Sequence, residues 1–148
     1  MLWRRKKTKT IIIIIDTNLW ISFLISGNYS KLNAVLSDKN VQLLFSQKLW
    51  AEFMTVVTRT KFRKYFSEDD IAELVSIMRR RIKMVAVKTT INICRDVKDN
   101  FLLELATDGK ANFLLTGDDD LLSLKKINKT KILTIQRFLK DYSEEVIL

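Results

Sequence analysis

Five short apolar runs, separated by longer segments with helical spacing, constrain the fold of this 148-residue chain more than any other feature. Each run is bounded by polar residues and has the length of a buried strand. The runs lie at residues 11–15, 41–45, 84–87, 112–115 and 131–133. Strands that alternate with helices predict a parallel sheet covered by helices on both faces. The sequence therefore predicts an α/β fold with three layers, α/β/α.

Helical spacing occupies most of the chain between these runs. The helical segments are about residues 18–37, 47–58, 67–82 and 99–107. The third segment opens with Ser67 and Asp70 in the spacing of a capping box. The chain contains no Pro and only three Gly, so nothing resembles a flexible linker between domains. We expect a basic arm over residues 1–10 and a single domain over residues 11–148.

The charge of the chain suits a polyanionic partner. Lys and Arg number 26 against 17 Asp and Glu, which gives a net charge of +9. Five of these positive charges belong to the arm, which holds no acid, so the rest of the chain carries only +4. The candidates for contact with a nucleic-acid backbone outside the arm are Arg59, Lys61, Arg63 and Lys64.

The sequence favours neither secretion nor membrane insertion. Asp16 and Asn18 interrupt the apolar run that follows the basic arm. No other run approaches the roughly 18 apolar residues that a membrane span needs. Cys94 is the only cysteine, so no internal disulfide can form. We therefore expect a protein of the reducing cytoplasm with no membrane partner.

Two acids stand where predicted strands end. Asp16 follows the first run directly, and Asp118 follows the fourth after Thr116 and Gly117. In α/β sheets, ligands bind beyond the carboxyl ends of the strands. If these two strands are neighbours, Asp16 converges with Asp118 or Asp120, and a cation is needed to offset their repulsion. Carboxylate oxygens favour a hard ion such as Mg²⁺ or Mn²⁺.

Two further acids can join this group. Asp99 stands at the start of the fourth helical segment, and Glu52 lies in the helix after the second strand. The chain has no His, so Ser-His and Cys-His nucleophile systems are excluded. Attack on phosphorus by water that a metal activates remains available.

Other interpretations of these acids remain open. Each Asp could serve only as a helix cap, and Glu52 could belong to a solvated helix face. A phosphatase of the haloacid dehalogenase type also begins with a strand that leads into an Asp. That chemistry needs a second Asp two residues later, where this chain has Asn18. A dinucleotide-binding fold is excluded because the three glycines cannot form its glycine motif.

From residue 11 to about residue 139 the chain resembles the PIN-domain family, in particular the branch described as toxin components of toxin-antitoxin systems. The residues that carry the resemblance lie at 14–18, 46–62, 94–106 and 116–122. The resemblance implies a five-stranded parallel sheet between layers of helices. It also implies a cleft in which catalytic acids hold Mg²⁺ or Mn²⁺. These acids are Asp16, Glu52, Asp99 and Asp118, with Asp120 as a further metal-binding acid.

The resemblance also implies roles for neighbouring residues and partners. The supporting residues are Thr17, Asn18, Asp96 and Thr116. The implied reaction is hydrolysis of single-stranded or looped RNA, and the expected partners are RNA, a cognate antitoxin and a second copy of the chain. DNA remains open as a substrate because no residue can be assigned to read the 2′-hydroxyl. The alternative is a catalytically silent PIN-like module that binds RNA or protein.

Overall fold

The computed structural model describes residues 9–93 and 99–147, with side chains described as far as Tyr142. Its centre is a six-stranded sheet in the order β3-β2-β1-β4-β6-β5. The strands are β1 (Ile11–Ile15), β2 (Val41–Phe45), β3 (Ile82–Met84), β4 (Phe113–Leu115), β5 (Lys126–Ile127) and β6 (Thr130–Leu133). All pairs are parallel except β5 with β6. The predicted α/β class is confirmed.

The predicted sheet of five parallel strands was wrong by one strand. β5 has only two residues, which is too short to produce an apolar pattern in the sequence. It pairs antiparallel with β6 because the chain reverses through Asn128, whose φ is 51°. Asn tolerates this left-handed conformation better than most residues.

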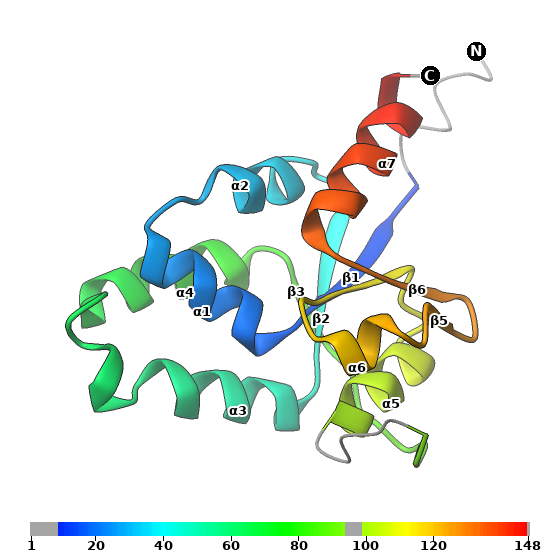
Figure 1. The fold of residues 1–148 in the computed structure, drawn as a ribbon, viewed down its shortest axis with the longest axis horizontal. Helices are drawn as coiled ribbons and strands as arrows, with labels where there is room; N and C mark the ends of the chain where they lie inside the picture. The colour runs from blue at the N-terminus through cyan, green and yellow to red at the C-terminus, as the bar shows by residue number, and fades with distance from the viewer. Residues whose placement is uncertain (1–8, 94–98, 148) are drawn as a thin grey trace.

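Helices connect the strands and cover both faces of the sheet. They are α1 (Thr17–Ser26), α2 (Ser30–Leu36), α3 (Gln47–Val57), the 3₁₀ turn η2 (Thr60–Phe62), α4 (Glu68–Arg79), α5 (Asn100–Asp108), α6 (Asp119–Leu122) and α7 (Ile135–Ile147). In Figure 1, α1, α2, α3 and α4 lie together on the left of the strands, whereas α5 lies at the lower right. Within residues 9–93 and 99–147, no helix is long and apolar enough to cross a membrane.

Alternating side chains of β2 show how the two helical layers are held. Phe45 packs edge-on against Trp50 and Phe53 of α3, with ring centroids 5.4 and 6.4 Å apart. The preceding residue, Leu44, points to the opposite face, because successive side chains of a strand alternate. There Leu44 lies under Gly109, at the end of α5. All of these apolar side chains except the half-buried Trp50 are buried in one continuous core.

Several predicted elements have different bounds in the structure, among them the helix predicted over about 67–82, which is α4 and ends at Arg79. The helix predicted over 18–37 is two helices, because Gly27 adopts φ 67° and ends α1 by donating its N–H to the carbonyl of Phe23 at 3.0 Å. The third strand covers 82–84 rather than 84–87. Its pairing partner β2 ends at Phe45, opposite Met84, so the apolar residues beyond Met84 have no strand to pair with.

Helix termini follow local chemistry closely. The predicted capping box is present: Ser67 Oγ accepts from the Asp70 N–H at 3.1 Å, and the Asp70 carboxylate accepts from the Ser67 N–H at 2.7 Å.

Helix α7 was not predicted. It packs onto β4 through Phe138, whose ring centroid lies 4.9 Å from that of Phe113.

Replacement of Gly109 by Ala should destabilise the fold. A Cβ at this position would lie 2.3 Å from Leu44 Cδ1, a side-chain atom of the core. Because overpacking a dense core typically costs about 1–3 kcal/mol, we expect Gly109→Ala to lower the free energy of unfolding by that amount in urea denaturation. Gly117→Ala is the matched control, since no atom lies within 4 Å of its added Cβ. Equal stability of the two variants would contradict this packing.

Candidate functional site

The pairing of β1 with β4 creates the central feature of the candidate site. Ile15 pairs with Leu115, so Asp16 and Thr116 are the first residues beyond two adjacent parallel strands. The Asp16 N–H donates to the carbonyl of Leu115 at 3.0 Å, which extends the pairing by one residue. β1 lies between β2 and β4, where the order of strands along the chain reverses. This switch point is where α/β sheets form ligand crevices.

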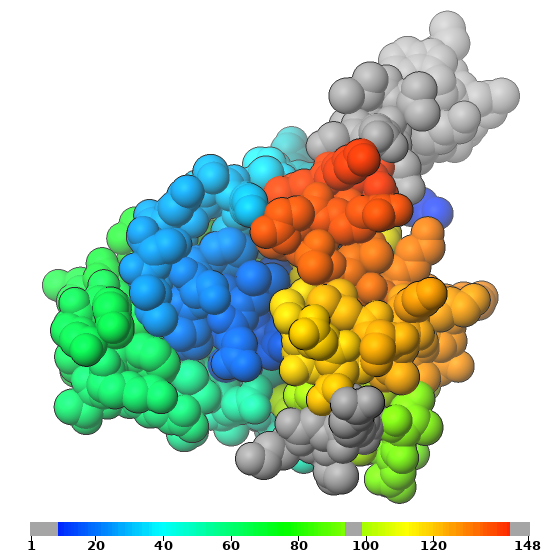
Figure 2. All heavy atoms as spheres, in the orientation of Figure 1, coloured from blue at the N-terminus to red at the C-terminus, as the bar shows by residue number. Residues whose placement is uncertain are grey.

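The Thr116 hydroxyl connects the two carboxyl-bearing segments. Its Oγ1 donates to Asp16 Oδ2 at 2.8 Å and accepts from the Asp118 N–H at 3.0 Å. Thr116 is 1% exposed and Asp16 is 7% exposed, so this hydrogen bond is shielded from water. In Figure 2 the blue surface of α1 borders the yellow surface around α6. Thr116 therefore holds Asp16 in place at the junction of these segments.

Asp16 and Asp118 also cap helices, as one interpretation of the sequence allowed. Asp16 accepts from the Asn18 N–H at 3.4 Å at the start of α1. Asp118 accepts from the Leu121 N–H at 2.9 Å at the start of α6. A carboxylate has about four lone-pair positions, so a capping bond leaves capacity for a cation. Capping therefore fixes these side chains without excluding a second role.

Glu52 reaches the same region from α3. Thr17 Oγ1, in the first turn of α1, donates to Glu52 Oε2 at 2.7 Å. Thr17 is 3% exposed, and Glu52 is half-buried. The hydrogen bond joins α1 to α3 and directs the Glu52 carboxylate toward the residues that follow β1.

The electrostatics of Asp16 reflect this crowding of acids. Burial raises the pKa of Asp16 above its ordinary value, and the negative charges of Glu52 and Asp118 raise it further. The hydrogen bonds from Thr116 and the Asn18 N–H favour the ionised form and oppose this rise. The three acids are thus near enough to influence one another, with Asp16 as the most buried.

The remaining predicted acids are Asp99, Asp120 and Asp96. Asp99 is half-buried and precedes α5 without a capping hydrogen bond from its side chain. Asp120 lies in the first turn of α6. Asp96 lies outside the described residues. Asn100 is 5% exposed and was not predicted as a site residue, although its place directly after Asp99 was a usable signal.

In the described part of the chain, the acids are not arranged as a complete metal-binding site. Among the side chains described, no three His, Cys, Asp or Glu residues are arranged as ligands of one metal ion. Asn18, predicted as a supporting residue, is exposed and contributes its backbone N–H to Asp16. The structure thus brings Asp16, Glu52 and Asp118 to one edge of the sheet but does not close them on a common point.

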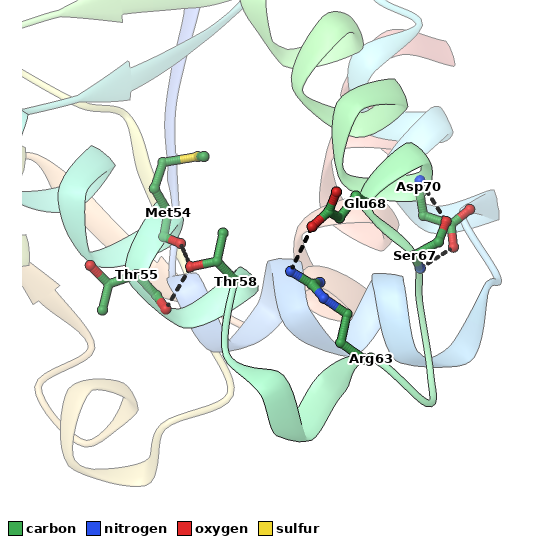
Figure 3. A network of polar contacts seen from close by, with 7 residues as sticks. All are labelled: Met54, Thr55, Thr58, Arg63, Ser67, Glu68 and Asp70. Carbon is green, nitrogen blue, oxygen red and sulfur yellow. Dashed lines mark hydrogen bonds and ion pairs between the residues drawn. The ribbon is translucent and has the colours of Figure 1, made fainter.

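The basic segment, residues 59–64, lies at the other end of α3 from this edge. Thr58 Oγ1 ends α3 by donating to the Met54 carbonyl at 2.7 Å (Figure 3). Beyond it, an Arg63 Nη atom lies 3.6 Å from Glu68 Oε1 (Figure 3). The other predicted contacts, Arg59, Lys61 and Lys64, are exposed. An 11-residue helix spans about 16 Å, which separates this segment from the start of α3.

The raised pKa of Asp16 predicts that ionisation of this side chain opposes folding. The folded protein holds the Asp16 proton more tightly than the unfolded chain, so the stability from protonation is lost as pH rises through the folded pKa. Without metal at pH 7, Asp16→Asn should raise the free energy of unfolding, because the Asn side chain brings no charge into this buried position. The gain should shrink below about pH 4. Urea denaturation in chelator at both pH values measures it, and a loss of stability that is equal at both would contradict it.

Comparison with known proteins identifies the family to which the chain belongs. Residues 12–120 match the family model described as PIN domain. The chain is also 28% identical over 143 residues to an uncharacterised protein of Methanocaldococcus jannaschii, an alignment that covers 89% of this chain and 92% of that protein. The matched region begins in β1, ends with Asp120 and includes Asp16, Glu52, Asp99 and Asp118. The family match covers well over half of the chain, which therefore belongs to the PIN-domain family.

Proposed function

We propose that this protein is an endoribonuclease that uses Mg²⁺ or Mn²⁺ to hydrolyse phosphodiester bonds of single-stranded or looped RNA. The observation that carries the proposal is the buried Asp16 carboxylate beside the negative charges of Glu52 and Asp118. Membership of the PIN-domain family supports it, since PIN domains are nuclease-like and generally use divalent metals.

The chemistry of the site fits a divalent cation. The charges that act on Asp16 are those of Glu52 and Asp118, and both are negative. Repulsion between buried carboxylates is relieved when a cation binds between them. All the candidate ligands are carboxylate oxygens, which Mg²⁺ and Mn²⁺ prefer. Asp16, Glu52, Asp99 and Asp118 would hold the metal, with Asp120 as a further ligand.

In this proposal, several residues position the metal-binding carboxylates. A bound cation supplies activated water and offsets charge on the phosphate. Thr116 keeps Asp16 oriented through its hydroxyl, and Thr17 keeps Glu52 turned toward β1. The Asn18 N–H fixes the second oxygen of Asp16. Asp96 and the Asn18 side chain belong to the same supporting set in this proposal.

The partners follow from the same proposal. The PIN family suggests RNA as the ligand, and Arg59, Lys61, Arg63 and Lys64 are proposed contacts for its backbone. The resemblance to toxin components supports the further proposal of a cytoplasmic toxin from a type II toxin-antitoxin system. Its partners would then be a cognate antitoxin and a second copy of the chain. A single-domain organisation over residues 11–148, after a basic arm, is part of this proposal.

The competing function is a catalytically silent PIN-like module that binds RNA or protein. One observation favours it: among the described residues, the acids form no group arranged to hold a metal ion. Such a module would bind RNA without cutting it, and its binding would not need a divalent metal. The two functions therefore separate in a cleavage assay.

Substitution of Asp16 should abolish cleavage. We expect the wild type to cut labelled single-stranded RNA with Mg²⁺ or Mn²⁺ and not with chelator. Asp16→Asn should lower the rate by at least about a hundredfold, as loss of a group that stabilises developing charge does. Asp69→Asn, at an exposed position of α4, is the matched control and should cut normally. Labelled DNA of the same sequence tests the choice of sugar. A folded wild type that cuts none of several RNAs would favour the binding module.

Divalent metal should stabilise the wild type through the same acids. A ligand that binds only the folded state adds about 2.7 kcal/mol when its concentration is about 100 times its Kd. We therefore expect Mg²⁺ or Mn²⁺ to raise the melting temperature of the wild type and of Asp69→Asn, and to raise that of Asp16→Asn much less. An equal rise in all three proteins would show that the metal binds elsewhere.

A further inference from the structure

A groove next to the candidate site is lined by residues that the proposed function leaves unused. It has a volume of about 850 Å³ and is lined by residues 46–48, 84–90, Phe101 and Glu104. We call it the β3–α5 groove. Pockets that hold small organic ligands have volumes of about 300–1,000 Å³. The groove is therefore large enough for a group the size of a nucleotide.

The β3–α5 groove opens at the same edge of the sheet as the acids. Ser46 follows the last residue of β2, and Val85 follows the last residue of β3. β2 and β3 are the first and second neighbours of β1 on that side, which places their ends about 5 and about 10 Å from that of β1. Phe101 lies two residues after Asp99 on the opposite wall. The groove thus extends away from Asp16 toward the edge strand.

Lys48 connects the groove with the acids. It lies four residues before Glu52 on α3, a spacing that places both side chains on one face of the helix. Its Nζ lies 5.0 Å from the centre of the Phe101 ring, within the range of a cation–π contact. This contact holds the ammonium group at the groove, between α3 and α5. A positive charge in the first turn of a helix is unfavourable unless an anion compensates it, and α3 has no acid in its first turn.

Residues 88–90, which also line the groove, are held to α5 by hydrogen bonds and include a second lysine. Asp108 of α5 accepts the N–H groups of Lys88 and Thr89 at 2.5 and 2.9 Å, and it also accepts the Thr89 hydroxyl. Glu104 accepts the N–H of Ile91 at 2.9 Å. These bonds tie residues 88–91 to α5, and Glu104 is the only carboxylate among the described residues that line the groove. Lys88 itself is exposed at the lining. A wall that is fixed in advance lowers the entropic cost of binding.

We propose that the β3–α5 groove binds the backbone phosphates of a single RNA strand on one side of the cleaved bond, with Lys48 and Lys88 as the contacts. This proposal rests on the proposed function, because it needs the scissile phosphate to lie at the acids. It assigns the groove to the neighbouring nucleotides. It also offers a way for an acidic centre to retain a polyanion, since Lys48 lies one helical turn before Glu52 and Lys88 lines the same groove.

The test measures RNA binding without cleavage. The probe is a fluorescent single-stranded RNA, titrated with the full chain in chelator at several salt concentrations. The double variant Lys48→Met and Lys88→Met keeps apolar stems, including the one over Phe101, and removes two charges. We expect binding about tenfold weaker, and a slope of log affinity against log salt that is smaller by about 1.4, or about 0.7 for each phosphate contact.

Lys31→Met is the control, because Lys31 is exposed on α2, at the opposite end of the molecule from the start of α3 (Figure 1). It should leave affinity and slope unchanged. Unchanged binding in the folded double variant, an equal loss in Lys31→Met, or no RNA binding by the wild type would each overturn the proposal. Cleavage is measured separately. If the wild type cuts RNA and the double variant binds RNA normally, the groove proposal is refuted and the nuclease proposal stands. If the double variant loses binding as expected but the wild type cuts no RNA, the groove stands as an RNA-binding surface and the nuclease proposal is refuted.

Discussion

The parallel pairing of β1 with β4 is the interaction on which the rest of the site depends. It joins segments 100 residues apart in the chain and sets Asp16 beside Thr116. Without it, Asp16 and Asp118 would each be a helix cap in a separate loop. With it, one buried hydroxyl orders both segments, and α1 starts where its first turn can reach α3. The candidate site is therefore a product of strand order.

The same arrangement places an ionisable side chain where its charged form is unfavourable for folding. Asp16 is nearly buried beside two other acids, and burial disfavours its charged form. The fold tolerates this because the strands around it are apolar and well packed: Ile13 and Ile14 of β1 and Leu114 of β4 are 0% exposed. Hydrophobic burial at this level offsets the cost of one unfavourable charge. Functional sites are the places where local rules of this kind are expected to be broken.

The sequence predicted those parts of the fold that depend on local pattern. β1 and β2 have their predicted bounds because each is a run of five residues, mostly large and apolar, with polar residues on both sides. The acids at the carboxyl edge could be predicted for the same reason, since their place depends only on where a strand ends. Glu52 was named as a further candidate because it lies in the helix after the second strand, and its role as a metal-binding acid came from the family resemblance.

Features that arise between segments could not be predicted. The hydrogen bond from Thr17 to Glu52 depends on how α1 and α3 pack. The early end of β3 depends on where β2 ends, because the apolar pattern continues past Met84 without a partner strand. The groove beside Lys48 exists only because residues 85–90 leave the sheet and run to α5. A single sequence contains no direct record of these contacts.

The carboxylates that bind residues 88–91 have a second consequence, for association between molecules. An exposed edge strand offers unpaired N–H groups to other chains and invites aggregation. β3 is such an edge, but it has only three residues, and the chain beyond it gives its N–H groups to Asp108 and Glu104 of α5. Another strand therefore finds little of this edge to extend. The opposite edge is shorter still, because β5 has two residues and the chain reverses directly after it. A largely parallel sheet thus ends on both sides in strands too short to seed growth.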